Sequence, residues 1–374
     1  MGRRLGAVKL VRRTLRTVAV AAAGIALVLS VGATPAEAQA LDRPLRVMTR
    51  NLYLGADLGP AVRATDTPTF LAAVAGIYAA NRATNFAVRA EAIAEEIRIT
   101  APDLVGLQEV SQWVPSGANT ELPQDFLEIL EQALAERGLD YAVASVSDNA
   151  VIGPVPLISP CASPTVGACL LTFKDRDVIL VNEETRRLQW GNPRSGTYQK
   201  QLFFTPQLPG AQPVSFRRGW TSIDGRFRGR SFHFVNTHLE TSIAPVVQLA
   251  QAQELLAGPA FGRGADLVVG DMNSAPDDST RPTYSLLTTR LRDAWRVRRG
   301  APGYTCCQQP TLTNPTSQLS RRIDLILVRG ARPVTARVVG NVPFAATPPL
   351  WASDHAGVVA ALQLRQASYR SGLS

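Results

Sequence analysis

Short runs of apolar residues alternate with polar and turn-forming segments along most of the chain after residue 40. Runs rich in Val, Ile, Leu and Phe that end at Gly, Pro, Asn or Asp are typical of strands. The pattern predicts strands at Leu45–Thr49, Leu104–Leu107, Tyr141–Val146, Val178–Val181, Val214–Ile223, Phe232–Val235, Leu267–Val269, Ile323–Val328 and Val358–Leu362.

Four other segments have helical spacing of their apolar residues. We expect helices at Phe70–Ala80, Phe86–Ile99, Asp125–Arg137 and Val246–Leu256, the third ending before Gly138, a favourable C-cap. Residues 154–164 and 305–319 are rich in turn formers and predict loops. With no composition break and no repeat, the pattern favours one α/β (α+β) sandwich domain over residues 41–374.

Residues 1–40 have a different pattern. Six cations precede the apolar run Val18–Val31, and small residues at A-x-A spacing follow around Ala38. This order is typical of a secretory signal peptide, so we expect a secreted or periplasmic (extracytoplasmic) mature protein. An uncleaved anchor is the alternative, although a span needs about 20 apolar residues. Arg12-Arg13 leaves twin-arginine export open beside the general route.

Composition and charge exclude several classes of protein. With 45% hydrophobic and 18% charged residues, the chain is neither disordered nor a coiled coil, and a single long apolar run excludes a multi-pass membrane protein. The formal net charge is +9, but residues 1–40 contribute six cations and one anion, so the remainder carries +4. A charge of +4 is weak support for nucleic-acid binding.

The four cysteines fit an oxidising compartment, so we expect disulfides. Cys161 and Cys169 could close a short loop, and Cys306 and Cys307 are adjacent. Three connectivities are possible, and the sequence does not choose among them. A zinc site is disfavoured, because no His lies near either pair at a suitable spacing.

Polar residues follow several predicted strands at the point where each strand ends. They stand in the segments Asn51, Gln108-Glu109, Thr237-His238, Gly270-Asp271-Met272-Asn273 and Ser353-Asp354-His355. Each segment alone has an ordinary explanation as a turn, cap or solvated loop. Together they predict a site, since strand ends that converge at one sheet edge are where α/β proteins build sites.

Alternation along the strands indicates which of these side chains share a face. Asp271 and Asn273 point the same way and Met272 points into the core, while His238 and His233 point to opposite sides. We therefore interpret His233 as structural or solvent-facing. Asn and carboxylate oxygens are hard ligands that suit Mg²⁺, Mn²⁺ or Ca²⁺, which leaves the imidazoles free to move protons.

These segments, together with Arg322-Ile323-Asp324, resemble the endonuclease/exonuclease/phosphatase superfamily. The superfamily includes deoxyribonuclease I-like nucleases, inositol phosphatases and neutral sphingomyelinases. The resemblance implies a four-layer α/β/β/α sandwich of two mostly antiparallel sheets flanked by helices. It also implies a hydrolase that cleaves a phosphoester, either as a phosphodiesterase or nuclease or in the manner of a phospholipase C, with Mg²⁺, Mn²⁺ or Ca²⁺ as cofactor.

The resemblance also implies a role for each site residue. Asn51, Glu109 and Asp354 would be metal-binding, with Glu109 the principal ligand. Asp271 would activate the attacking water, Asn273 would contact the phosphate, and His238 and His355 would stabilise the phosphorane or protonate the leaving oxygen. Asp324 would orient His355.

The chain departs from the family in one stretch. Some nucleases of the family have a Tyr and an acidic residue before a central strand, whereas Phe173–Asp177 has no phenol. Asp175 and Asp177 both remain candidates to support His238. An arginine cluster (Arg217, Arg218, Arg226, Arg228 and Arg230) flanks a predicted hairpin near Gly225 or Gly229; we interpret it as a solvated hairpin, with polyanion binding as the alternative.

The substrate is left open by the sequence. Nucleic acid, a phospholipid headgroup and a small organophosphate all fit the chemistry, and no stable protein partner is implied, so we expect a monomer. The alternative function is a non-catalytic binding module on the same fold.

Overall fold

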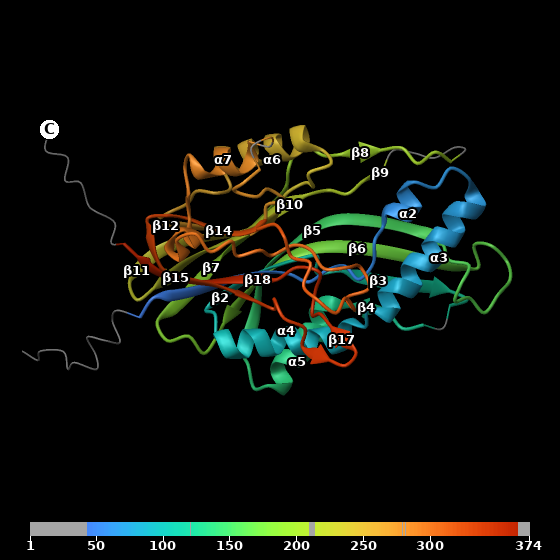
Figure 1. Cartoon of the computed structure of the whole chain (residues 1–374), viewed down its shortest axis with the longest axis horizontal. Coiled ribbons are helices and arrows are strands. Elements are labelled where there is room, and N and C mark those ends of the chain that lie inside the picture. Colours follow the sequence, from blue (N-terminus) through green and yellow to red (C-terminus); the bar gives the residue numbers. More distant parts are fainter. Residues whose placement is uncertain (1–42, 120, 209–213, 279, 281, 366–374) are drawn as a thin grey trace, which may run out of the picture. The chain divides into compact units, whose positions relative to one another are not determined.

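Two β-sheets packed face to face form the centre of the described structure (Figure 1). The computed structural model describes residues 43–119, 121–208, 214–278, 280 and 282–365, which belong to one compact unit. The predicted signal segment, residues 1–40, lies outside the described residues. No helix in the described part is both long and apolar enough to cross a membrane.

The first sheet has the strand order β15-β18-β1-β2-β6-β3-β4, with β5 paired to β6. Its strands are β1 Leu45–Asn51, β2 Leu104–Gln108, β3 Gln112–Gly117, β4 Gln124–Asp125, β5 Tyr141–Pro156, β6 Cys169–Asn182, β15 Ala331–Val339 and β18 Gly357–Leu364. All neighbours are antiparallel except β1 and β2.

The second sheet has the order β13-β14-β12-β11-β10-β7. Its strands are β7 Leu188–Thr197, β10 Gly219–Phe227, β11 Arg230–His238, β12 Ala265–Asp271, β13 Arg292–Asp293 and β14 Asp324–Arg329. Here β11 and β12 are the parallel pair. Two small ribbons complete the strands: β8 Phe203–Phe204 with β9 Val214–Ser215, and β16 Ala345–Ala346 with β17 Pro349–Leu350.

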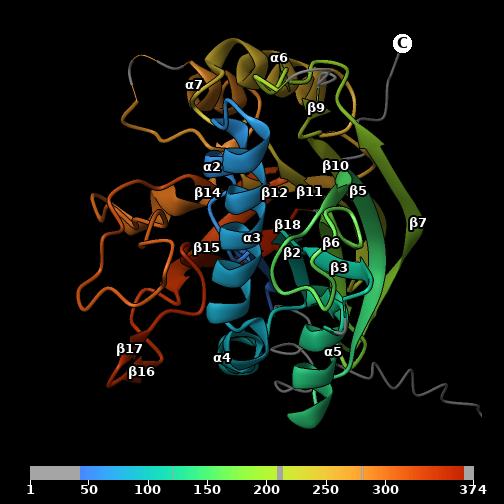
Figure 2. The same cartoon turned by 90° about the vertical axis from the view of Figure 1, so that its right-hand side faces the viewer.

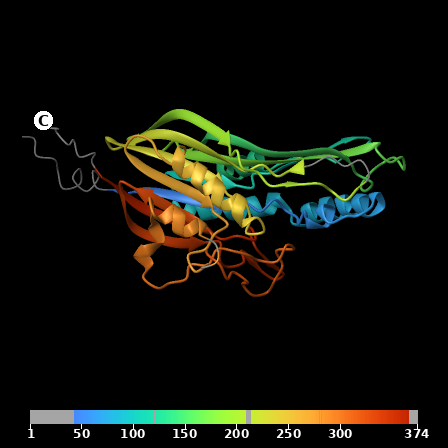
Figure 3. The same ribbon diagram turned by 90° about the horizontal axis from the view of Figure 1, so that it is seen from above.

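Helices cover the outer faces of both sheets. Helices α4 Phe86–Thr100 and α5 Phe126–Glu136 pack on the first sheet, and α6 Pro245–Ala257 and α7 Thr283–Thr288 pack on the second. Figure 3 shows this order from above. The helices α2 Gly59–Val62 and α3 Thr67–Ala83 lie beside one end of the first sheet, and a 3₁₀ turn spans Ala294–Arg298. The predicted four-layer α/β/β/α sandwich is therefore confirmed.

The helices predicted from periodicity are all present, with ends that differ by at most three residues from those predicted. Strands were predicted less completely. Strands β7 and β15 are sheet edges with exposed, polar faces, so they lack the apolar run that marks a buried strand. The predicted loop 154–164 begins later than expected, because β5 continues to Pro156.

The single strand predicted at Val214–Ile223 is wrong. The chain forms β9 in the ribbon with β8, has no strand structure at residues 216–218, and begins β10 of the second sheet at Gly219. The side chain of Gln201 replaces the missing strand neighbour: its Oε1 accepts from the Arg218 N–H at 2.8 Å, and its Nε2 donates to the Arg218 carbonyl at 2.9 Å. This break determines where the Arg218 side chain points.

A buried polar bridge fixes the two sheets relative to each other. Gln108 Nε2 on β2 donates to Asn236 Oδ1 on β11 at 2.6 Å, and Asn236 Nδ2 donates to the carbonyls of Leu107 and Val178 across the interface. Gly106 permits the approach, since a Cβ there would lie 2.7 Å from Asn236 Oδ1. The carboxyl ends of β2 and β11 consequently face each other.

Candidate active site

The topology brings the polar strand ends to one edge of both sheets. Strand β1 ends at Asn51 and β2 is followed by Glu109; β11 ends at His238 and β12 ends at Asp271. All four are carboxyl ends of the two parallel pairs. Two antiparallel neighbours add their amino-terminal ends: Asp324 begins β14 directly opposite Asp271, and His355 lies just before β18. Residues more than 300 positions apart in the sequence thus share one site.

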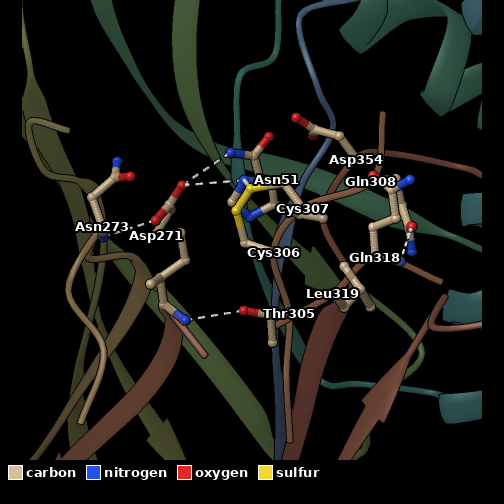
Figure 4. The surroundings of a disulfide bond; sticks show 12 residues. Asn51, Asp271, Asn273, Thr305, Cys306, Cys307, Gln308, Gln318, Leu319 and Asp354 are labelled. Atoms are coloured by element: carbon tan, nitrogen blue, oxygen red, sulfur yellow. Dashed lines mark hydrogen bonds and ion pairs between the residues drawn. A yellow bond between two sulfur atoms is a disulfide. The ribbon is translucent and has the colours of Figure 1, made fainter. Parts of the chain in front are cut away.

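Asn51, Glu109 and Asp271 are in direct contact. Asn51 Nδ2 donates to Glu109 Oε1 at 3.1 Å. It also donates to Asp271 Oδ2 at 3.3 Å (Figure 4). The second Glu109 oxygen accepts from the backbone N–H of Leu54 at 2.8 Å. Glu109 and Asn273 have φ of +56° and +49°, a left-handed conformation that is costly for residues other than glycine and is found at functional sites.

Asp271 lies at the centre of the site and is buried. Its Oδ1 accepts from the backbone N–H of Asn273 at 2.8 Å, and its Oδ2 lies 3.5 Å from His238 Nε2 and 3.8 Å from His355 Nε2. Burial, followed by the charge of Asp324, raises the pKa of Asp271 to about 7. A carboxylate with this pKa can accept a proton from water near neutral pH.

His355 is held as a cation. Its Nδ1 contacts Asp324 Oδ2 at 2.8 Å, and its carbonyl accepts from Arg50, which is itself paired with Glu96. Burial alone would lower the pKa of His355, but the carboxylates of Asp324, Asp354 and Asp271 raise it well above the ordinary value. His355 therefore carries a proton that it can donate.

His238 is held neutral. Burial, followed by the positive charges of Arg218 and His355, lowers its pKa well below the ordinary value. Arg218 Nη1 lies 2.9 Å from His238 Nδ1. Because a guanidinium can only donate, Nδ1 must accept, and the ring proton belongs on Nε2. That nitrogen lies 3.5 Å from Asp271 Oδ2. The amide nitrogen of Asn273, 3.1 Å away, is also a donor and donates to the carbonyl of Leu239, so with Nε2 protonated the two nitrogens do not hydrogen-bond to each other.

Asp354 lies at the edge of this group. Its backbone carbonyl accepts from the Gln308 N–H at 2.8 Å. Among the described residues, no hydrogen bond joins it to Asn51 or Glu109. Burial raises the pKa of Asp354 to about 6; the charge of His355 opposes this shift and the charge of Glu109 adds to it. The pKa values of Asp354 and Asp271 are thus raised first by burial, and neighbouring carboxylates add to the effect in both cases.

The donor set fits a hard divalent cation. Carboxylate and amide oxygens of Glu109, Asp354 and Asn51 are the ligands that such cations prefer. The acidic residues also disfavour each other's ionisation, and a cation among them would relieve that repulsion. The residues present therefore agree with a site for Mg²⁺ or a similar ion.

Comparison with known proteins agrees with this geometry. A family model described as the Endonuclease/Exonuclease/phosphatase family matches residues 74–355. The chain belongs to the endonuclease/exonuclease/phosphatase family. Family members are phosphoester hydrolases that are generally divalent-metal dependent, and this chain is an enzyme of that class.

Solved structures of family proteins have the same fold. One from Beutenbergia cavernae is 22% identical, with a TM-score of 0.52 over 86% of this chain and 72% of that one. A mannosyl-6-phosphatase from Bacteroides thetaiotaomicron is 17% identical, with a TM-score of 0.52 over 85% and 99% of the two chains. A protein from Leptotrichia buccalis is 13% identical, with a TM-score of 0.53 over 86% and 100%. No curated protein matches the sequence.

Every site residue predicted from the sequence lies in or beside this one site. Met272 is buried in the core beneath it. His233 lies elsewhere: it is buried between Asp224 and the carbonyl of Pro259, which makes it structural and not solvent-facing.

Of the two open candidates to support His238, neither Asp175 nor Asp177 forms a hydrogen bond with it among the described contacts; Arg218 lies at its Nδ1. Nothing in the local sequence distinguished Arg218 from its neighbours in the arginine cluster. That cluster is also divided in space: Arg226, Arg228 and Arg230 surround the β10–β11 turn at the opposite end of both strands.

The cysteines form two pairs. Cys161 is bonded to Cys169, with a Cα–Cα distance of 5.8 Å. The Cys306–Cys307 disulfide lies beside Asn51 and Asp271 (Figure 4), and Cys307 Sγ is 3.8 Å from His355 Nε2. The sequence spacing gave no sign that a His would lie near this pair. As disulfide sulfurs, however, the two cysteines are not thiolate ligands for a metal.

Proposed function

We propose that the protein is an exported, divalent-metal-dependent hydrolase of phosphoester bonds, in which Asp271 is the general base and His355 the general acid. The observation that carries the proposal is the arrangement around Asp271: a buried carboxylate with raised pKa stands between a neutral and a cationic imidazole, 3.5 and 3.8 Å away. One site therefore holds both a carboxylate that can accept a proton, Asp271, and a cationic imidazole that can donate one, His355.

Each residue of the site has a separate role in the proposed reaction. Asp271 Oδ2 takes a proton from the attacking water as the water oxygen bonds to phosphorus. His355 gives its Nε2 proton to the leaving oxygen as the old P–O bond breaks. The His238 Nε2–H and the Asn273 amide donate to the phosphate oxygens, where negative charge increases. Asp324 holds the His355 ring in orientation.

A cation held by Glu109 and Asn51, with Asp354 beside them, would neutralise charge on the phosphate. Arg218 contributes by fixing the tautomer of His238. The function includes export, for which the pattern of residues 1–40 is the support. Amino-terminal sequencing of protein recovered outside the cytoplasm should begin at Leu41.

The test is hydrolysis of bis(p-nitrophenyl) phosphate with Mg²⁺, Mn²⁺ or Ca²⁺ and with EDTA. Asp271→Asn should lower turnover by about 10²–10⁴ while circular dichroism stays unchanged, because an amide still accepts from Asn273 but takes no proton from water. Asp140→Asn, an exposed carboxylate before β5, is the matched control and should keep full activity.

Two results would contradict the proposal. Activity that survives complete chelation would exclude a metal role for Glu109, and normal turnover of a folded Asp271→Asn protein would exclude it as the base. A panel of plasmid DNA, RNA, sphingomyelin and inositol phosphates then identifies the substrate. No cleavage of any ester with any cation would favour a binding module.

A further inference from the structure

The strands β3, β5 and β6 and the helices α2 and α3 lie together at one end of the first sheet (Figures 1 and 2). Side chains of these elements line an open apolar pocket, with the strands on one side and the helices on the other. Its volume is about 140 Å³, and every described side chain along its wall is apolar. Val74 and Ile77 of α3 face Trp113 and Phe173, which pair across β3 and β6 with ring centroids 4.7 Å apart.

The β8–β9 ribbon supplies the remaining wall. Phe204 and Phe216 contribute stacked rings 5.8 Å apart, and both line the pocket. The one polar atom of Trp113, Nε1, donates to the carbonyl of Leu54 at 3.0 Å. The pocket therefore offers no free hydrogen-bonding group from its aromatic residues, and a polar ligand would lose its hydration there without compensation.

Three chain segments lead directly from this pocket to the active site. On β6, Phe173 and Asp175 share a face, and two strand residues span only about 7 Å; Asp175 interacts electrostatically with Glu109 and Arg218. Phe216 stands two residues before Arg218, which contacts His238. Leu54 links the two places, because its N–H binds Glu109 and its carbonyl binds Trp113.

We propose that the pocket binds an acyl chain of a lipid phosphoester whose phosphate lies in the active site. This inference rests on the function proposed above and names its substrate class. The nearness of pocket and site is the argument: Leu54 hydrogen-bonds to Glu109 on one side and to Trp113 of the pocket wall on the other, so a long apolar group on a substrate whose phosphate lies at Asp271 would reach the pocket. A nucleotide base would instead require hydrogen-bond partners that the pocket wall does not offer.

Exposed apolar side chains continue outward from the pocket. Phe203 is 64% exposed and precedes Phe204, and Val151 is 62% exposed and precedes Ile152, both of which line the pocket. Such residues suit contact with a lipid surface from which a chain would enter. The volume suits part of a chain, since apolar cavities of roughly 150 Å³ hold about six carbon atoms as benzene.

The test compares methyl, hexyl and dodecyl p-nitrophenyl phosphate below the concentrations at which they form micelles. Each buried methylene strengthens binding by roughly fourfold, so the KM of the hexyl ester should be at least about tenfold below that of the methyl ester. The step from hexyl to dodecyl should be smaller, because the pocket is then full.

Ala61→Trp places a large side chain in the pocket from α2 and should abolish the dependence of KM on chain length while the methyl ester is cleaved as before. Ala92→Trp, at a half-buried alanine of α4 outside the pocket, is the matched control. Thermal melts establish that both variants fold. Vesicles of sphingomyelin and of phosphatidylcholine then distinguish the two lipid sources.

Calorimetry of dodecylphosphocholine binding to the metal-free protein separates this inference from the proposed function. Binding that Ala61→Trp abolishes and Ala92→Trp retains supports the pocket even if no ester is cleaved. EDTA-sensitive cleavage with the same KM at every chain length, or equal binding by both variants, would overturn the inference and leave the hydrolase intact.

Discussion

At the residue scale, the site separates two chemically identical side chains by their surroundings. His355 is surrounded by three carboxylates, whereas His238 faces a guanidinium. Both are buried, so the difference comes from the neighbouring charges and not from solvent. The cation can donate a proton, and the neutral ring can donate a hydrogen bond without competing for the proton of Asp271.

This difference predicts the titration of the three histidines. In the metal-free protein, the ring of His355 should stay protonated well above pH 6.5, and the ring of His238 should stay neutral well below it. Asp324→Asn should lower the pKa of His355, because it removes the nearest negative charge. Proton NMR of the ring protons measures all three directly, since the chain has only three His.

His233→Gln assigns the third resonance and should leave the other two unchanged. Ring signals of His238 and His355 that titrate together near pH 6.5 would contradict the division of roles. Residue types and strand parity were enough to separate His238 from His233 in the sequence. They could not separate His238 from His355, because the deciding charges come from distant segments.

At the scale of elements, the site depends on the alignment of two strands from different sheets. The bridge between Gln108 and Asn236 joins β2 to β11 immediately before Glu109 and His238. Both side chains are fully buried, and their hydrogen bonds replace the water they lose. The bridge therefore fixes the spacing between Glu109 at one end of the site and the His238 imidazole at the other.

Asn236→Ala should lower the free energy of unfolding by about 3 kcal/mol, because it leaves Gln108 and the carbonyls of Leu107 and Val178 without their partner. Urea unfolding measures this loss, and turnover should fall as well, since the two strand ends lose their alignment. Asn341→Ala, at an exposed asparagine, is the control. A change within about 0.5 kcal/mol of the control would show that the bridge is dispensable.

The burial of each helix and strand also explains which of them could be predicted from the sequence. Buried strands and amphipathic helices carry their periodicity in the sequence, and these predictions were confirmed with small shifts at the ends. The edge strands β7 and β15 carry no such signal. The break at residues 216–218 depends on Gln201, a side chain from another segment, which local sequence patterns do not record.

At the scale of the whole molecule, the protein contains several buried carboxyl groups whose ionisation is costly. Burial, together with neighbouring carboxylates, raises the pKa values of Asp175 and Asp271 to about 7 and that of Asp354 to about 6. A carboxylate with a raised folded-state pKa destabilises the fold when it ionises. Its cost is absent below the unfolded pKa near 4, grows as the pH rises and is complete above the folded pKa.

Asp175→Asn should therefore stabilise the metal-free protein relative to wild type, and the gain should grow from pH 4 to pH 7 and then level off. The shift from 3.8 to about 7 sets an upper limit of about 4 kcal/mol at pH 8. Urea unfolding in EDTA across this range measures it, with the exposed Asp140→Asn as a control that should show no such trend. A gain that is constant with pH would indicate an effect unrelated to ionisation.

The sequence by itself determined which polar residues lie together at the proposed site, because each of them is adjacent to an apolar strand whose pattern can be read locally. The fold class followed from the same patterns together with the family resemblance. Only the tertiary structure decided that Arg218 faces His238, that the Cys306–Cys307 disulfide lies beside His355, and that an apolar pocket opens beside Trp113 and Phe173. The physical reason is that these features are contacts between segments far apart along the chain. Their charge, burial and shape exist only after the two sheets have packed together.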